Sequence, residues 1–176
     1  IISNLRIGLA DMTIMDSLAV AFLGSKDQRI IIEVKYNIRP DHGEIDNIVA
    51  KEGLNGLHRI QIQVGIPIRM MLASRIPYMQ IHAKMGGKSF IAEYKYDGER
   101  VQVHKNQKNV ILYSRQLKAI TEQYPDVVDA IQKNIHADSA ILEGEIVAMD
   151  PFFEKMLPFQ VVSTRRRKYD IEKMVK

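Results

Sequence analysis

The sequence contains no cysteine. The chain can therefore form no disulfide, no thiolate zinc site and no thiol nucleophile, so any catalysis must use oxygen or nitrogen groups with hard metal ions. It also lacks the run of roughly 18 consecutive apolar residues that a membrane-spanning helix requires. The first six residues have none of the regions of a secretory signal peptide. We therefore expect an intracellular protein, in the cytoplasm or nucleoid, with no membrane association.

The composition is that of a globular protein. The chain has 176 residues, of which 46% are hydrophobic and 26% charged, which allows one large domain or two small ones. A net charge of +4 permits a polyanionic partner such as nucleic acid or a nucleotide. The chain starts at Ile1 and stops at Lys176 inside a predicted helix, so we expect a piece of a longer protein.

The first sixty or so residues are predicted to be mainly helical. One apolar face has residues at three- and four-residue spacing: Met15, Leu18, Ala19 and Phe22. A second helix is predicted to begin at Asp41, because Glu44 three residues later completes a capping box, and to end at Gly53. From Leu57 the period changes. Apolar and polar residues alternate up to Val64, which predicts a half-buried strand, and we place a domain boundary at residue 65.

The remainder of the chain predicts an α+β pattern. Strands are expected over residues 90–95, 101–103, 110–114 and 140–149, with turns at 97–98 and 106–109. A helix is expected over residues 125–135, with proline in its first turn. Lys95 then stands at the end of a strand, before a turn glycine that lets another group approach. A neutral lysine amine in that position is a candidate nucleophile, although an ordinary surface lysine in a hairpin gives the same four-residue pattern.

Several motifs in one order resemble a known family. The segment EYKYDGERVQVHK at residues 93–105 closely resembles the nucleotidyl-transfer motif of ATP-dependent DNA ligases, particularly the archaeal and eukaryotic replicative type. YSR at 113–115, LEGEIV at 142–147, and FQ at 159–160 with RRRKY at 165–169 resemble the motifs that follow it in that family. LRIG at 5–8 and MDSLA at 15–19 resemble its helical DNA-binding domain. GIPIRMMLA at 65–73 resembles its linker, with Met70 where the family usually has proline.

The resemblance implies an architecture of two incomplete domains. Residues 1–64 would be the C-terminal part of the helical DNA-binding domain. Residues 65–176 would be the first half of an adenylation domain, an ATP-grasp-like nucleotidyltransferase domain of antiparallel sheet and helices. The family's later motifs and its OB-fold domain are not found in this sequence. We therefore expect this piece to be inactive or weakly active.

The resemblance also implies a reaction and roles for particular residues. Lys95 would attack the α-phosphate of ATP, with Mg²⁺, to give lysyl-AMP; AMP would pass to the 5′-phosphate at a DNA nick, and the 3′-hydroxyl would then displace it. Glu93 would contact adenine, and Glu145 would bind the ribose hydroxyl and help to place the metal. Arg100 and Arg115 would hold the ribose and phosphate side. Each of these side chains, taken alone, is also consistent with an ordinary surface residue.

DNA contacts are expected at two places. Arg6 and Gly8 would lie against the DNA backbone. The basic run Arg165, Arg166, Arg167 and Lys168 would grip phosphates, although a solvated helix face explains that run equally well. The expected partner is nicked double-stranded DNA bound by a monomer, with a sliding clamp contacted through segments outside this chain.

Two other functions remain open from the sequence. An RNA ligase or capping guanylyltransferase shares the Lys-x-Asp-Gly pattern, and a truncated DNA-binding module would use the basic surface alone. The five histidines show no metal-ligand spacing, so none is assigned to a metal. His104 in particular is expected on the polar side of its strand.

Overall fold

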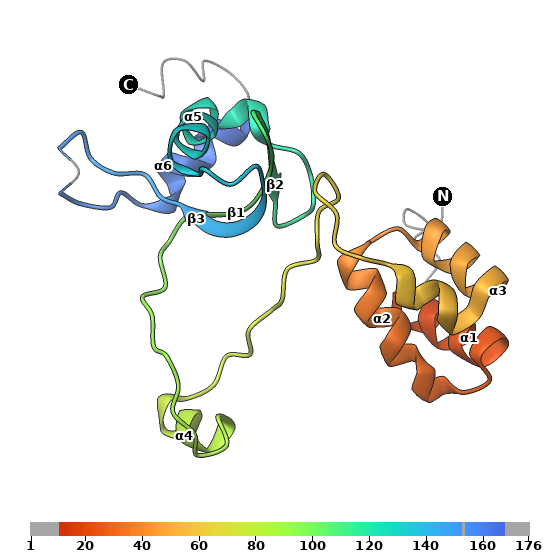
Figure 1. Ribbon diagram of the computed structural model, residues 1–176. Helices are drawn as coiled ribbons and strands as arrows, with labels where there is room; N and C mark the ends of the chain where they lie inside the picture. Colours follow the sequence, from red (N-terminus) through yellow and green to blue (C-terminus); the bar gives the residue numbers. More distant parts are fainter. Residues whose placement is uncertain (1–10, 153, 168–176) are drawn as a thin grey trace. The chain divides into compact units, whose positions relative to one another are not determined.

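The computed structural model describes residues 11–152 and 154–167 (Figure 1). These residues fall into two compact units. The first is drawn from the chain up to Arg69 and from Val101–Gly144, and the second from Met70–Arg100 and the described residues after Gly144. Arg6, Gly8 and Lys168, which the resemblance assigns to DNA binding, lie outside the described residues.

Three helices form the amino-terminal part of the first unit: α1 (Asp11–Leu23), α2 (Arg29–Ile38) and α3 (His42–Arg59), with the 3-10 turn η2 (Lys26–Gln28) between the first two. As predicted, α3 is capped by Asp41, whose carboxylate accepts a hydrogen bond of 3.1 Å from the backbone N–H of Glu44. The helices enclose a single apolar core. Its buried members are Met15, Ala19, Ile32, Tyr36, Ile45, Val49, Leu57 and Ile60. Phe22, expected on the buried face of α1, is half exposed.

The predicted end of the helix at Gly53 is confirmed as an interruption of α3 but not as its last turn. Gly53 has left-handed φ of 58° and kinks the helix, but helical turns resume and continue to Arg59. The resumed helix packs closely against the preceding turns at Gly56. A Cβ there would lie 2.6 Å from Cγ2 of Ile48, so a larger residue would not fit. The strand expected from Leu57 to Val64 is also absent. Its apolar residues do not share one face, since Ile60 completes the helical core while Ile62 is 57% exposed.

The predicted strands after residue 98 are confirmed. β1 (Glu99–Asn106), β2 (Asn109–Ser114) and β3 (Ser139–Ile146) form one sheet in the order β2-β1-β3, and β1 pairs with β2 in antiparallel register. Gln107, with φ of 52°, makes the turn between β1 and β2. The 3-10 turn η4 (Thr121–Gln123) and helix α5 (Pro125–Asn134) connect β2 to β3. The fold class is α+β, as predicted.

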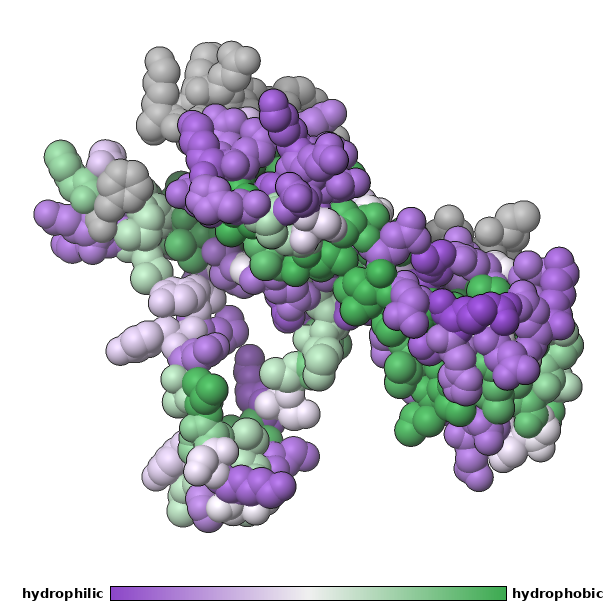
Figure 2. Space-filling model, viewed as in Figure 1, coloured by the Kyte–Doolittle hydropathy of each residue, from purple (hydrophilic) through white to green (hydrophobic). Residues whose placement is uncertain are grey.

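Residues 70–98 of the second unit carry little regular structure. Only the 3-10 turn η3 (Tyr78–Gln80) and the short helix α4 (Ile81–Lys84) occur there. The strand predicted over 90–95 is wrong, because no described strand lies alongside to bond its backbone, and an unpaired extended segment is not a stable strand. Several apolar side chains of this segment are more than 70% exposed: Met71, Leu72, Tyr78, Met79 and Ile91. Figure 2 shows hydrophobic and hydrophilic residues mixed on the surface of the part that contains α4.

The segment after β3 folds back on itself and then becomes helical. Leu157 donates its N–H to the carbonyl of Ala148 at 2.8 Å, and Met149 bridges Met156. Helix α6 (Phe159–Ser163) and the 3-10 turn η5 (Thr164–Arg167) follow. Among the helices described here, none is both long and apolar enough to cross a membrane.

Candidate active site

Lys95 is exposed, in the extended segment between α4 and β1. No hydrogen bond or ion pair joins its amine to another described residue. Tyr94 is 88% exposed and Tyr96 46% exposed, so both rings beside the lysine remain on the surface of the described chain. The lysine amine is thus accessible to a ligand.

Gly98 packs the turn after Lys95 against the end of β3. A Cβ built on Gly98 would overlap the carbonyl oxygen of Ile146 and would lie 2.9 Å from Cγ of Glu145. Only glycine allows so close an approach of these two backbones. Within the second unit, the motif that contains Lys95 and the motif that contains Glu145 therefore lie next to each other, although they are fifty residues apart in the sequence.

Glu93 and Arg100 flank the same turn. Glu93 is exposed in the extended segment, and Arg100 stands at the start of β1. The Arg100 guanidinium donates to the carbonyl of Met71 at 3.3 Å, which ties the beginning of residues 70–98 to their end. Glu93 and Glu145 can accept hydrogen bonds, and the Arg100 guanidinium is suited to oxyanions.

Arg115 belongs to the first unit, whereas the other candidate nucleotide-contacting residues belong to the second. It is exposed in the tight turn that follows β2. This turn is closed by the N–H of Leu117, which donates to the carbonyl of Ser114 at 2.9 Å, and Leu117 has φ of 61°. Arg115 thus directly follows the end of β2, the position that the sequence predicts for it.

The basic run after α6 is described only in part. Arg165 is half-buried in η5, which continues through Arg166 to Arg167. The described residues contain no group of three histidine or acidic side chains that would hold a metal ion. Glu145, the residue considered as a metal ligand, is an exposed strand residue.

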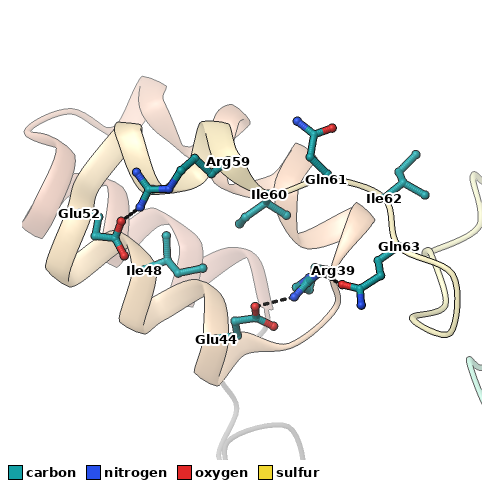
Figure 3. Close-up of a pocket in the computed structure, with 10 residues that line it drawn as sticks. Arg39, Glu44, Ile48, Glu52, Arg59, Ile60, Gln61, Ile62 and Gln63 are labelled. Atoms are coloured by element: carbon teal, nitrogen blue, oxygen red, sulfur yellow. Dashed lines mark hydrogen bonds and ion pairs between the residues drawn. The ribbon is translucent and has the colours of Figure 1, made fainter.

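An open cavity lies away from these residues. It has a volume of about 450 Å³ and lies beside α3 in the helical part of the first unit (Figure 3). Ion pairs border it: Arg39 contacts Glu44 at 2.7 Å, and Arg59 contacts Glu52. The charges in this cavity are thus paired with each other, and it contains none of the candidate residues.

Sequence reasoning missed that polar residues of β1 are buried, His104 and Gln102 most completely. His104 is 1% exposed and Gln102 is 2% exposed, so the expectation of a polar, outward side for His104 is wrong. The reason is that distant residues pack on His104: Nδ1 accepts the N–H of Gly65 at 2.8 Å, and the Tyr113 ring meets the imidazole edge-on with centroids 5.0 Å apart. All five residues from Val101 to Lys105 are buried. The alternation of apolar and polar residues in this strand therefore does not correspond to one buried and one exposed face.

The fold and this arrangement indicate a nucleotidyltransferase-type domain, and comparisons with known proteins agree. The family model of the ATP dependent DNA ligase domain matches residues 70–176. The chain is 51% identical over 177 residues to "DNA ligase 2" of Thermofilum pendens, and 49% identical over 174 residues to a DNA ligase of Sulfurisphaera tokodaii. These alignments cover 100% and 98% of this chain.

The chain belongs to the ATP-dependent DNA ligase family. A DNA ligase of Staphylothermus marinus is similarly related, at 51% identity over 98% of this chain. The chain spans about 29% of the length of each of these three curated relatives. The resemblance found in the sequence motifs is confirmed.

Proposed function

We propose that this chain is the part of an ATP-dependent DNA ligase that carries the nucleotide-accepting lysine, Lys95. The packing of Gly98 against Glu145 and Ile146 gives this proposal its main structural support. It holds the turn after an accessible lysine next to a carboxylate of a second family motif. Membership of the ligase family supports the same proposal.

The chemistry proposed for Lys95 is nucleophilic attack on phosphorus. The neutral Nζ attacks the α-phosphorus of ATP, a nitrogen–phosphorus bond forms, and the bond to the oxygen of pyrophosphate breaks while the amine loses a proton. Glu93 and Glu145 offer acceptors for amino and hydroxyl groups of the nucleotide, and Arg100 and Arg115 offer guanidinium forks for its oxyanions. Mg²⁺ would neutralise phosphate charge.

The whole protein is proposed to seal 3′-hydroxyl/5′-phosphate nicks in duplex DNA inside the cell, as a monomer. Residues 1–64 are proposed as the end of its helical DNA-binding domain and residues 65–176 as the first part of its adenylation domain. Arg165 to Arg167 are proposed to contact DNA phosphates, which predicts binding that weakens as salt concentration rises.

A segment exchange tests this function. This chain replaces the matching 177-residue segment of the Thermofilum pendens relative, and the product is incubated with α-labelled ATP, Mg²⁺ and nicked duplex DNA. We expect covalent labelling and sealing of DNA nicks but not of RNA nicks. Both should be lost in Lys95→Ala and kept in Lys88→Ala, which changes another exposed lysine.

The exchange also separates the alternatives. Covalent label that persists in Lys95→Ala would refute the proposal. Sealing of RNA ends alone would indicate an RNA ligase. DNA binding with no covalent label, in an exchanged protein whose thermal melt matches that of the relative, would indicate a non-catalytic module.

A further inference from the structure

Residues 65–68 are held by side chains of β1 and β2, in an arrangement that we name the clasp. The N–H of Gly65 donates to Nδ1 of His104 at 2.8 Å, and the carbonyl of Gly65 accepts from the Tyr113 hydroxyl at 2.8 Å. The N–H of Ile68 donates to Oε1 of Gln102 at 2.8 Å, and its carbonyl accepts from Nε2 of Gln102 at 3.3 Å. Four backbone groups of the segment are thus bonded to three side chains.

The clasp explains the burial of two of the polar residues of β1. His104 and Gln102 are almost fully buried, and buried polar side chains are costly unless they are hydrogen-bonded. Both ring nitrogens of His104 bond within the clasp, since Nε2 lies 2.8 Å from Oε1 of Gln102. The amide of Gln102 is used on both its oxygen and its nitrogen.

These bonds are compatible with only one protonation state of His104. Nδ1 accepts the N–H of Gly65, so it carries no hydrogen, and Nε2 must then donate to the Gln102 oxygen, which has no hydrogen of its own. A second proton on the ring would place an N–H on Nδ1, directly facing the N–H of Gly65. The neutral imidazole closes the clasp, and the imidazolium breaks it.

Among the described residues, the partners bonded directly to the His104 ring are Gly65 and Gln102, and neither is a carboxylate. Tyr113 of β2 meets the ring edge-on, with centroids 5.0 Å apart, and burial raises the pKa of this tyrosine, so it is neutral. Glu143 of β3 accepts its bond from Gln102, at 3.4 Å. Residues 65–68 contain no ionisable side chain. Burial accordingly lowers the pKa of His104 from its usual 6.5.

The next residue is held by the helices. The N–H of Arg69 donates to the carbonyl of Asn37 at 2.8 Å, and its guanidinium lies 3.3 Å from a carboxylate oxygen of Asp11 and 5.0 Å from the ring centroid of Tyr36. All these residues belong to the first unit. The connection between helices and sheet is therefore bonded to the sheet at 65–68 and to the helices at 69.

We propose that the clasp is a pH-operated latch: neutral His104 fixes residues 65–68 to β1 and β2, and protonation of His104 releases them while the helices and the sheet stay folded. This inference is independent of the ligase function proposed above. It assigns His104 a role in holding the connection between helices and sheet, apart from any contact with nucleotide.

Amide hydrogen exchange on the full ¹⁵N-labelled chain tests the latch. Protection of the Gly65 and Ile68 amides, corrected for intrinsic exchange, is expected to fall at least about tenfold between roughly pH 7.5 and pH 5. The amide of Leu112, bonded to the Thr121 hydroxyl at 3.0 Å, is the internal control and should keep its protection. Unchanged protection at Gly65 and Ile68, or an equal fall at Leu112, would overturn the latch.

Two further measurements keep the test specific to His104. In His104→Gln, protection of Gly65 should be low at both pH values, whereas His58→Gln, which changes an exposed histidine, should behave as the wild type. If His104→Gln does not fold, the ¹⁵N chemical shifts of the His104 imidazole in the wild-type protein provide the test. A neutral ring with its hydrogen on Nε2 at pH 6.5 supports the latch, and a charged ring or the other tautomer at that pH refutes it.

Discussion

The α-carbon of Gly98 faces the carbonyl oxygen of Ile146 so closely that no Cβ atom fits between them. This contact joins the turn after Lys95 to the end of β3, where Glu145 lies. Neither partner is near the other in the sequence, and the side chains of the nucleotide-transfer motif do not themselves form the contact. Because glycine has no side chain, the two family motifs can lie in contact at this point.

The first prediction concerns this contact. Gly98→Ala should lower the free energy of unfolding by about 1–3 kcal/mol, because the added methyl group forces the two backbones apart. Gly144→Ala is the matched control, since a Cβ at Gly144 meets nothing within 4 Å. Urea unfolding followed by circular dichroism measures both. Equal effects of the two substitutions would show that Gly98 is not in tight contact with β3.

The second prediction concerns the turn of α3 beyond the kink at Gly53. Leu57 is fully buried in the helical core, so Leu57→Ala should cost about 2–5 kcal/mol of stability through lost contacts and the cavity left behind. Leu72→Ala, at a position that is 72% exposed, should stay within about 0.5 kcal/mol of the wild type. A small effect at Leu57 would mean that the last turns of α3 lie outside the core.

The third prediction concerns the cap of α3. Asp41→Ala removes the acceptor for the N–H of Glu44 and should cost about 1 kcal/mol. Asp41→Asn keeps a side-chain acceptor and should cost only a few tenths of a kcal/mol. Thermal unfolding of the two variants side by side measures the difference, and similar losses in both would argue that the charge of Asp41 matters more than its cap.

The fourth prediction concerns alkaline pH. The Tyr113 hydroxyl must keep its proton to donate to Gly65, and burial raises the pKa of Tyr113 above its usual 10.0. The folded state therefore holds this proton longer than the unfolded state, so the stability it contributes is present below pH 10 and is lost as pH rises from 10 through the pKa of the folded protein.

Tyr113→Phe measures that contribution. It should lower the free energy of unfolding by about 0.5–1.5 kcal/mol near neutral pH, the net value of one hydrogen bond, and the difference from wild type should shrink above pH 10. Tyr78→Phe, at a position that is 81% exposed, is the control. A difference that stays constant through this pH range would contradict the bond between Tyr113 and Gly65.

Local sequence patterns predicted the elements whose stability is local. The cap at Asp41, the turn between β1 and β2, and the helix that begins at Pro125 follow from spacing and residue type, and the structure confirms them. The strand predicted over residues 90–95 failed because alternation describes a surface, whereas a strand also needs a neighbour for its backbone. The strand prediction at Ile60 was wrong because Ile60 packs into the helical core. The alternation of apolar and polar residues does not reveal that core.

The sequence by itself determined the chemistry that this chain can offer: a lysine, two carboxylates and two arginines in the order of a ligase family, and no thiol. The tertiary structure decided which of its polar residues are buried and what they hold. His104 and Gly65 are 39 residues apart, and their bond exists because the tertiary fold packs residues 65–68 against side chains of β1 and β2. Burial depends on neighbours that are distant in sequence, so a residue's own segment carries the motif but not its environment.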